Sequence, residues 1–552
     1  MLLALLAILA LFYTVLLWIG VVHSYHHLHI LLLVFQYALI LPAIWAYLRA
    51  HATRESQDAR ISLPSRTGIV FLFAVVVFPL SWLSTRGLLN PDESGYSFEA
   101  RIFVSGHLKA APLVGATANV RATPDEDFFG NHVLRPDGWF PKFPPGWPGV
   151  LAVGYAVSAP WIITPILSLL SLVTIAAIGR QIFSEQVGLL AICFAILSSF
   201  YLVNSIGMMS HALCGLLSAL ACFCLFRGLD TGSLSYFWGM FACLGFALQV
   251  RPYTAFVLAV VMTAAALWRT RTQPAFCLRI FAIGCLVGGI ALFAVLVYNQ
   301  LYTGNWLQSP YALAAGAQAP PELSFHPARI WQGIAQYGRQ TFEESLIGIF
   351  PFAYLLAGYA VFSEQEHRWE TRVLAAIYIS LVLAYLAHPE GSGNFFGERF
   401  HFEGIFAVFL LAARGAVLFI ERWKSSRSAV TFALAVLVMM QLSQQAAAAI
   451  TVARQGEPYR KLRAATAQVP NGIVFLHDSP GFVAKHFNLN QADWRHAPHI
   501  FLVDADPEQR NEWACRYQSS TWTVAEYDPK THSALLDTQS TSCSVRTAQP
   551  TK

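Results

Sequence analysis

The stretch LLNPDESGYSFEARIF, residues 88–103, places two adjacent carboxylates, Asp92 and Glu93, directly after a long apolar segment. Asn90 is a favourable helix N-cap, Pro91 suits the first helical position, and acidic side chains are favoured in the first turn. The pattern therefore predicts a helix that begins at residue 91. The two carboxylates have two interpretations: they cap this helix, or they perform chemistry at a membrane surface.

The composition of the whole chain indicates a polytopic helical membrane protein. Its 552 residues are 56% hydrophobic and 12% charged, with a mean hydropathy of +0.49, whereas soluble proteins carry about a quarter charged residues. The net charge of +5 gives no reason to expect a nucleic-acid partner. Apolar stretches of membrane-spanning length predict about thirteen transmembrane helices, near 1–22, 29–49, 67–84, 161–179, 187–204, 209–226, 234–250, 253–268, 280–299, 345–362, 373–388, 404–420 and 428–450.

Basic residues predict how these helices are oriented. If the N-terminus is cytoplasmic, most arginines of the short loops lie inside, and the short outer loops hold only Arg251 and Arg399. This is the asymmetry of the positive-inside rule. The stretch 147–158 is too short to span a bilayer and is expected to lie in the interface or to enter the membrane partly. The large segments 85–146 and 300–344 and the C-terminal tail are then outside.

We expect three units along the chain: two additional N-terminal helices with a cytoplasmic loop at 1–66, a transmembrane domain at 67–450 with the outer loop 85–146, and a small extracytoplasmic α/β domain at 451–552. The last unit contains three strand-like runs, 472–478, 499–505 and 521–528. It also contains Cys515 and Cys543. An oxidising compartment permits a disulfide between them, but the sequence leaves their distance open.

Several residues on the outer side are candidates for a binding site. Asp92, Tyr96, Glu99 and Phe103 form a mixed polar and aromatic stripe on the predicted helix, suited to a sugar or lipid head group. In GWFPKFPPGWPGV, residues 138–150, Lys142 is either a solvated loop lysine or a ligand for a lipid phosphate.

Other candidates also have a structural alternative. Arg251 is either an interfacial anchor or a site residue, and His211 either ends a helix or, with Asn204, lines a pocket. Asp125 and Asp127 have a spacing that suits Mg²⁺ or Mn²⁺, although acidic turns of this kind are common.

Together the motifs resemble the GT-C membrane glycosyltransferases, and most closely the branch that contains protein O-mannosyltransferases and the lipid A aminoarabinose transferase. The resemblance covers most of residues 67–410 in organisation. Its specific parts are the Asp-Glu pair of NPDESGYSFEARIFVSGHL and the Lys-x-Pro-Pro-Gly run of WFPKFPPGWPGVLAVGY. The sequence departs from the family in two places. Two helices precede the one that normally comes first, and GNFFGERFHFEG (393–404) lacks the proline that follows an Arg-Tyr pair in many relatives.

The resemblance implies an inverting transfer of a sugar from a polyprenyl-phosphate donor to an acceptor hydroxyl outside the bacterial inner (plasma) membrane. The acceptor would be a glycan, lipid or protein of the cell envelope. No cofactor is implied, and a divalent metal is possible but not favoured. The roles that it implies are Asp92 as general base, Glu93 as its partner, Lys142, Arg399 and Arg251 as phosphate ligands, and Tyr96 and His211 as further substrate contacts.

Three other classes of membrane protein fit parts of the pattern, and one of them is a non-catalytic membrane scaffold with a sensory tail. A secondary transporter predicts ionisable residues or broken helices at mid-membrane and a repeated half, whereas the predicted spans carry almost no charge at their centres. Another lipid-linked glycan transferase, of the O-antigen ligase or polymerase type, would also use a polyprenyl carrier. It would lack the Asp-Glu pair in the first outer loop.

Overall fold

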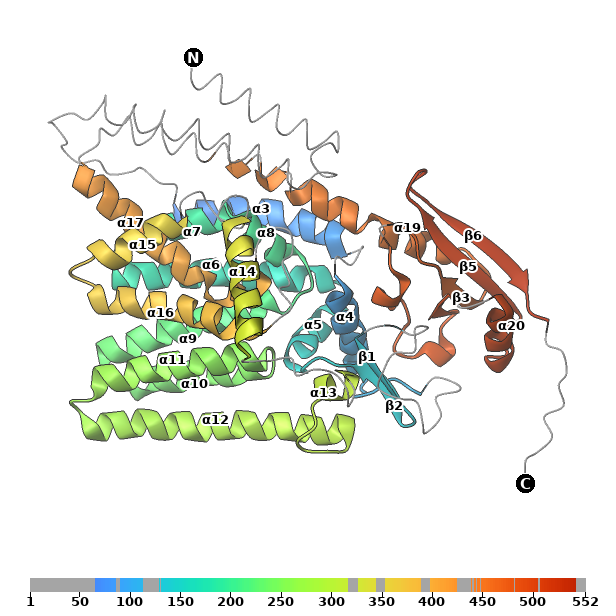
Figure 1. The fold of residues 1–552 in the computed structure, drawn as a ribbon, viewed down its shortest axis with the longest axis horizontal. Coiled ribbons are helices and arrows are strands. Elements are labelled where there is room, and N and C mark those ends of the chain that lie inside the picture. The colour runs from blue at the N-terminus through green and yellow to red at the C-terminus, as the bar shows by residue number, and fades with distance from the viewer. Residues whose placement is uncertain are drawn as a thin grey trace, which may run out of the picture.

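A computed structural model shows a bundle of roughly parallel and antiparallel helices with a small β-sheet at one end (Figure 1). The predicted helices 1–22 and 29–49 and most of the predicted helix 428–450 lie outside the described residues, as do Asp125 and Asp127. The structure describes residues 65–85, 90–112, 129, 131–315, 326–343, 353–388, 398–423, 438, 441–442, 444–446, 448–480, 482–504 and 507–542.

Six of the described helices are long and apolar enough to cross a membrane, or seven if one bent pair counts as a single span. The bent pair is α7 (Glu185–Ile196) and α8 (Ser199–Ile206), whose axes differ by 71°. The six are α3 (Arg66–Thr85), α6 (Ile163–Ile182), α9 (His211–Thr231), α11 (Pro252–Thr270), α12 (Pro274–Thr303) and α17 (Ile405–Trp423).

The prediction of about thirteen spans is therefore supported only in part. The stretch 187–204 forms two helices, because the hydroxyl of Ser198 accepts the Tyr201 N–H at 3.1 Å and starts a new helix there. Three other predicted spans correspond to helices that do not meet the length and hydropathy of a span: α10 (Leu234–Leu248), α15 (Ala353–Ser363) and α16 (Arg368–Tyr385).

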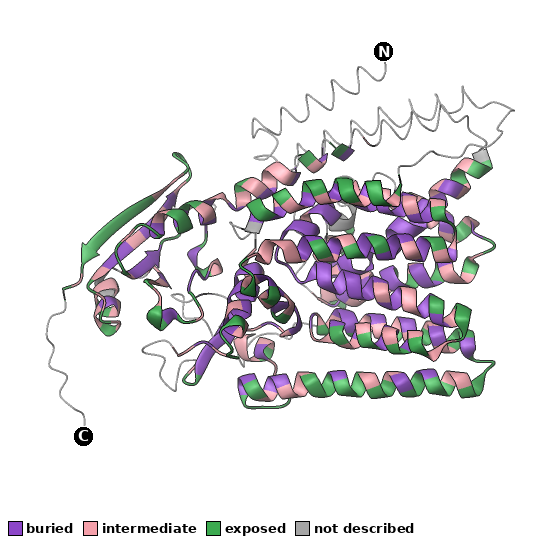
Figure 2. Cartoon of the chain, turned by 180° about the vertical axis from the view of Figure 1, so that it is seen from behind, coloured by how far each residue is buried: buried purple, intermediate pink, exposed green. Residues whose placement is uncertain are grey.

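The centre of the bundle is formed by α6, α7, α9 and α17, which are mostly buried, whereas α12 lies at its edge (Figure 2). On α12, Ile290 and Phe293 are about three-fifths exposed, as expected of a helix that faces lipid. Close packing inside the bundle depends on small residues. A Cβ atom on Gly179 of α6 would lie 2.6 Å from the Cα atom of Gly188 on α7.

The two ends of the bundle differ in character. At one end, α6, α9 and α11 finish close together: Gln181 donates to Asp230 at 2.7 Å, and Arg269 lies over the ring of Trp369 at 5.7 Å. At the other end lie the first residues of α9 and α11 and the short helices α4 (Pro91–Val104) and α5 (Gly146–Ala156). These two helices and the loops around them support the candidate site.

Helix α4 begins as the sequence predicts, with Asn90 as its N-cap. The Asn90 Oδ1 atom accepts the Asp92 N–H at 2.9 Å. The predicted short segment at 147–158 is the helix α5. Between α4 and α5, the strands β1 (His132–Arg135) and β2 (Gly138–Pro141) form an antiparallel hairpin that leads into Lys142.

We expect Asn90→Ala to lower the free energy of unfolding by about 1 kcal/mol, because the Asp92 N–H loses its acceptor. Asn90→Ser, which keeps a side-chain oxygen at this position, serves as the control and should unfold like the unmodified protein. Denaturation of the purified protein followed by circular dichroism measures both. Equal stability of the alanine and serine variants would contradict the capping role.

The C-terminal unit, defined as residues 457–540, contains a four-stranded sheet in the order β4-β3-β5-β6. β3 is parallel to β4 and β5, and β6 is antiparallel to β5. The three strands predicted here are confirmed. The elements are α19 (Glu457–Thr466), β3 (Gly472–Leu476), η4 (Ala484–His486), η5 (Trp494–His496), β4 (His499–Val503), α20 (Pro507–Arg516), β5 (Thr521–Asp528) and β6 (Ser533–Ser540).

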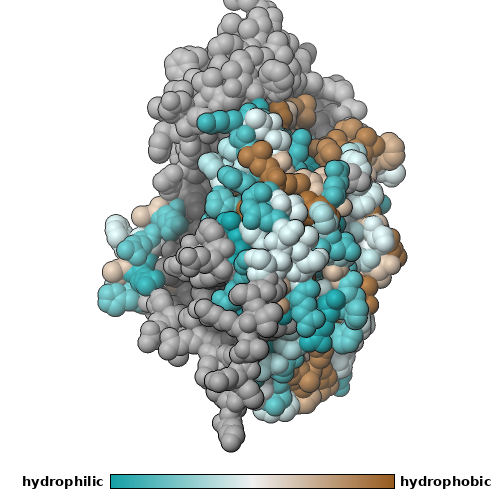
Figure 3. Space-filling view, turned by 90° about the vertical axis from the view of Figure 1, so that its right-hand side faces the viewer, coloured by the Kyte–Doolittle hydropathy of each residue, from teal (hydrophilic) through white to brown (hydrophobic). Residues whose placement is uncertain are grey.

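Cys515, on α20, is disulfide-bonded, and its expected partner Cys543 lies outside the described residues. Figure 3, which views the molecule from the end where this unit lies, shows mainly hydrophilic and neutral residues with a few hydrophobic patches. The remaining described elements are η1 (Pro160–Ile162), α13 (Pro310–Ala315), α14 (Pro327–Glu343) and η3 (Arg399–Gly404).

The C-terminal unit is packed directly against α4 and α5. Trp147, Met208, Tyr459 and Trp494 belong to one continuous cluster of buried apolar side chains. The indole N–H of Trp494 also donates to the Ala111 carbonyl oxygen at 2.9 Å. The first turn of α4 is thus enclosed between the helical bundle and the C-terminal unit.

Candidate active site

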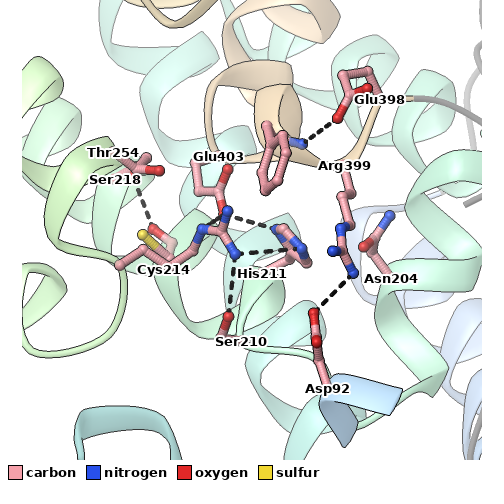
Figure 4. Close-up of polar contacts among 12 residues, drawn as sticks. Asp92, Asn204, Ser210, His211, Cys214, Ser218, Thr254, Glu398, Arg399 and Glu403 are labelled. Atoms are coloured by element: carbon pink, nitrogen blue, oxygen red, sulfur yellow. Dashed lines mark hydrogen bonds and ion pairs between the residues drawn. The ribbon is translucent and has the colours of Figure 1, made fainter. Parts of the chain in front are cut away.

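Asp92 and Arg399 meet at the end of the bundle, although they lie far apart in the sequence. Asp92 is in the first turn of α4, and Arg399 begins η3, the 3₁₀ turn that leads into α17. One guanidinium nitrogen, Nη1, lies 3.2 Å from Oδ2 of Asp92. The other carboxylate oxygen accepts a hydrogen bond from Nδ2 of Asn131 at 3.1 Å. The two side chains keep 22% and 15% exposure, so the pair can be reached from outside (Figure 4).

A second, more deeply buried ion pair lies behind the first. Nε of Arg251 is 3.0 Å from Oε1 of Glu403, and Nδ1 of His211 is 2.9 Å from the same oxygen. Glu403 and His211 are fully buried, and Arg251 is 13% exposed. Because Glu403 balances the charge of Arg251, this group can remain away from water. Figure 4 shows His211, at the start of α9, beside Glu403 of η3, and Arg251 is the N-cap residue of α11.

Phe400 joins the two ion pairs. The guanidinium of Arg251 lies 5.3 Å from the centre of its ring, and that of Arg399 lies 5.4 Å from the same centre. On α16, the ring of Tyr385 stacks on Phe400 with the centroids 4.7 Å apart. Since cations are attracted to aromatic faces, Phe400 helps to fix the positions of both arginines.

Tyr96 connects α4 to the buried pair. Its hydroxyl is 3.3 Å from that of Ser210, which also lies 3.4 Å from Nη1 of Arg251. Burial raises the pKa of Tyr96 to about 12, and the negative charge of Asp92 adds to this effect, while Arg251 opposes it. Tyr96 is therefore a neutral phenol at physiological pH and acts as a hydrogen-bonding group.

The predicted polar and aromatic stripe on α4 is not an open binding surface. Tyr96 is 4% exposed and Glu99 is fully buried, because the ring of Phe143 packs on Tyr96 at 4.2 Å between centroids and Tyr298 covers Glu99. Asp92 is the residue of this stripe that remains accessible, in its ion pair with Arg399. Helical periodicity does not show what covers a face, and the substrate contact predicted for Tyr96 stays a prediction.

Glu93 points away from Asp92. Its carboxylate is 2% exposed and accepts the Met208 N–H at 3.0 Å, in the turn between α8 and α9. This bond attaches the start of α4 to the bundle. The structure thus gives Glu93 a positioning contact, and its predicted part as a partner of Asp92 in the reaction stays a prediction.

Lys142 lies at the edge of the site. The backbone N–H of Lys142 donates to the Asn131 carbonyl oxygen at 3.0 Å, and the side chain of Asn131 bonds to Asp92. Its Nζ atom lies 5.1 Å from the ring centre of Tyr311. Asn204, on α8, is beside Arg399 (Figure 4) and donates to the Phe200 carbonyl oxygen at 2.9 Å.

Three residues around Asp92 and Arg399 were not predicted from the sequence. Glu403 follows Arg399 by four positions in a stretch rich in aromatic residues. This spacing of opposite charges was the feature of the sequence that could have indicated Glu403. Asn131, which holds Asp92, gave no signal. His486, on η4 of the C-terminal unit, is also near Asp92: burial and Lys485 lower the pKa of His486, whereas the charges of Asp478 and Asp92 raise it.

The position of His486 follows from a buried contact two residues further along the chain. The backbone N–H of Asn488 donates to the hydroxyl of Ser94 at 2.7 Å. The side-chain nitrogen Nδ2 of Asn488 lies 3.1 Å from Nε2 of His132. The C-terminal unit therefore borders the first turn of α4.

The described residues contain no group of three or more His, Cys, Asp or Glu side chains placed to hold a metal ion. The predicted weak candidates, Asp125 and Asp127, lie outside that part of the chain.

Comparison with known proteins shows a partial family match and a similarity in fold. The family model for dolichyl-phosphate-mannose-protein mannosyltransferases matches residues 153–298. No curated protein sequence matches significantly. Two solved structures of ArnT from Cupriavidus metallidurans are similar in fold. The form bound to undecaprenyl phosphate has a TM-score of 0.52 at 12% identity, covering 85% of this chain and 94% of ArnT. The apo form has a TM-score of 0.53 at 13% identity, covering 84% and 94%.

Proposed function

We propose that this chain is a membrane glycosyltransferase, on the basis of its similarity in fold to ArnT and of the family model that matches residues 153–298. It transfers a sugar from a polyprenyl-phosphate donor to an acceptor hydroxyl on the extracytoplasmic side and inverts the anomeric centre. The observation that carries the proposal is the accessible pair of Asp92 and Arg399. It supplies a base and a phosphate-binding cation in one place.

The reaction requires one proton transfer and one displacement. Asp92 accepts the proton of the acceptor hydroxyl as the acceptor oxygen forms a bond to the anomeric carbon. The bond between that carbon and the phosphate oxygen breaks, and its electrons leave with the polyprenyl phosphate. Arg399 stabilises the negative charge of this leaving group. Direct displacement from the opposite face accounts for the inversion.

The ion pair also suggests an order of events. While Arg399 contacts Asp92, one carboxylate oxygen is occupied by the guanidinium and the other by the Asn131 amide. A donor phosphate competes for Arg399, because guanidinium groups bind phosphate in two-pronged hydrogen bonds. Its arrival frees one oxygen of Asp92 for the acceptor. The base thus becomes available when the donor is in place.

The surroundings support this assignment of charges. Arg251 is balanced by Glu403 and therefore orients Phe400 rather than binding the donor directly. Lys142, whose backbone N–H donates to the Asn131 carbonyl oxygen and whose Nζ lies over the ring of Tyr311, is the second candidate for a phosphate ligand. The ArnT structure bound to undecaprenyl phosphate supports a polyprenyl carrier.

We also propose the orientation and location of the protein. The short loops at the bundle end away from the site carry most of the arginines, which favours that end as cytoplasmic. The site and the C-terminal unit then lie on the outer side of the bacterial inner membrane.

The test is to incubate the purified full-length protein with a panel of radiolabelled polyprenyl-phosphate sugars and cell-envelope acceptors. We expect one donor to be consumed and its label to appear in an acceptor. Treatment with a chelator should leave the rate unchanged, because Arg399 supplies the charge that a metal would otherwise provide. A chelator-sensitive rate restored by Mn²⁺ would instead implicate Asp125 and Asp127. Uptake of label into vesicles without transfer would support a transporter.

Replacing Arg399 by glutamine should raise the KM for the donor and lower kcat by about tenfold or more, since a charge-assisted hydrogen bond to phosphate contributes about 1.5–3 kcal/mol. Arg399→Lys should recover part of the loss. Steady-state kinetics with the donor identified above measure both. The matched control is Arg135→Gln, on the nearby β1–β2 hairpin, where the arginine pairs with Asp137 at 3.1 Å. An unchanged KM in the Arg399→Gln variant would exclude Arg399 as the phosphate ligand.

A further inference from the structure

A separate polar cavity lies between α4, α5 and the C-terminal unit. Its volume is about 420 Å³, within the range of small-molecule sites. Ser97 and Arg101 of α4, Tyr155 of α5, and Tyr459 and Arg463 of α19 line it. Ser97 follows Asp92 by five residues, which turns its side chain about 140° around the helix from that of Asp92. The cavity is therefore on another side of α4 from the candidate active site.

The lining presents mainly hydrogen-bond donors and positive charge. Nε of Arg101 donates to the Ser97 carbonyl oxygen at 3.2 Å. This bond holds the guanidinium of Arg101 close to the preceding turn of α4. Burial raises the pKa of Tyr459, while the charges of Arg463 and then Arg101 oppose that rise. Both guanidinium groups therefore lie near the Tyr459 hydroxyl, one from each side of the interface between α4 and the C-terminal unit.

Little negative charge offsets these two cations. Among the described residues that line the cavity, Asp493 is the acidic one. Its carboxylate is 63% exposed and lies 2.9 Å from the ring of His496, on the same short segment. Gln491 adds an amide group to the lining. Two arginines, two phenols, a hydroxyl and an amide form a donor set that suits an anion with several oxygen atoms.

The side chains that line the cavity are held in place by burial and by hydrogen bonds. Ser97 is 2% exposed and Tyr459 is 6% exposed, and both belong to the enclosed part of the molecule. The hydroxyls of Ser97 and Tyr155 both face the sulfur of Met208, at 3.2 and 3.9 Å. The backbone N–H of Met208 is also the group that holds Glu93. The floor of the cavity is thus connected to the first turn of α4.

We propose that this cavity is a second binding site, which takes a phosphate group carried by a lipid head group or by a soluble sugar. A phosphate between Arg101 and Arg463 links α4, the helix that carries Asp92, to the C-terminal unit. Binding would therefore hold the C-terminal unit on the bundle.

The test uses the full-length protein and two probes. In nanodiscs of phosphatidylcholine, glucose 1-phosphate is added, with glucose as the control. In a parallel arm, part of the lipid is replaced by phosphatidic acid. We expect one phosphate probe to raise the unfolding temperature: the sugar phosphate indicates a soluble ligand, and phosphatidic acid indicates a lipid head group. If neither probe raises it, the proposal is wrong.

Variants assign the effect to the cavity. Arg101→Gln and Arg463→Gln should each weaken binding of the effective probe by about tenfold, the loss expected for a charge-assisted hydrogen bond. Arg495→Gln, the same change outside the cavity on the same unit, should bind normally. Binding that persists in Arg399→Gln separates this cavity from the active site.

Two outcomes would overturn the assignment. One is equal binding by Arg101→Gln, Arg463→Gln and the unmodified protein, and the other is an equal loss in Arg495→Gln. The variants Arg101→Met and Arg463→Met also remove the charge while keeping most of the side-chain volume, and they give the same comparison if a glutamine variant does not fold.

Discussion

Asp92→Asn is expected to abolish measurable sugar transfer while leaving the fold intact. The substitution keeps the size of the side chain and removes the group that accepts the proton, a contribution of about 10²–10⁴ in rate for a general base. The ion pair with Arg399 is partly exposed, so its loss should change stability by about 1 kcal/mol or less. Transfer from the identified donor and thermal unfolding measure the two effects separately.

The matched control is Asp137→Asn. Asp137 is also a paired carboxylate outside the bundle, 2.6 Å from Lys109 and 3.1 Å from Arg135. It should lose a similar amount of stability and retain transfer. If Asp92→Asn still transfers sugar at the normal rate, Asp92 is a helix-capping and ion-pairing residue and not the base.

Glu403→Gln is expected to have the largest effect on stability. It leaves the buried guanidinium of Arg251 without its counter-charge, and breaking a buried ion pair from one side costs about 3–5 kcal/mol. Transfer should fall as well, because Arg251 and Arg399 share the ring of Phe400. Unfolding in detergent and donor turnover are the measurements.

A double variant distinguishes the loss of charge balance from a general packing defect. Arg251→Met with Glu403→Leu removes both charges and should be more stable than either single change, since apolar replacements of buried pairs are often neutral or stabilising.

The matched control breaks another ion pair of the bundle: Glu364→Gln breaks the pair between Glu364 and Arg414, 2.5 Å apart. It should reduce stability without a specific loss of transfer. If Glu403→Gln is as stable as the unmodified protein, the buried pair does not hold the site together.

The start of α4 could be predicted from the sequence because its signals are local. An N-cap, a proline at the first helical position and acidic residues in the first turn all act within four residues, and each reflects backbone hydrogen bonding or the helix dipole. The same applies to the strands of the C-terminal unit and to the short helix at 147–158. The bend after α7 was missed, since Ser198 lies within an uninterrupted apolar stretch.

The candidate site could be predicted only in part. Asp92 and Arg399 were both named, but nothing in the sequence showed that they contact each other. Arg251 was predicted as a phosphate ligand, which stays a prediction, but nothing in the sequence showed that it contacts Glu403. Asn131 and His486 were missed because their roles depend on neighbours that are distant in the chain.

Sequence by itself determined that this is a multi-pass membrane protein and that a helix with two carboxylates in its first turn begins at residue 91. These follow from hydropathy, from charge and from local backbone chemistry, all of which act over a few residues or a single helix. Only the tertiary structure decided which side of α4 remains open, which arginine has its charge balanced, and that the C-terminal unit borders the site. Burial and electrostatic pairing depend on contacts between distant segments, and such contacts exist only once the chain has folded.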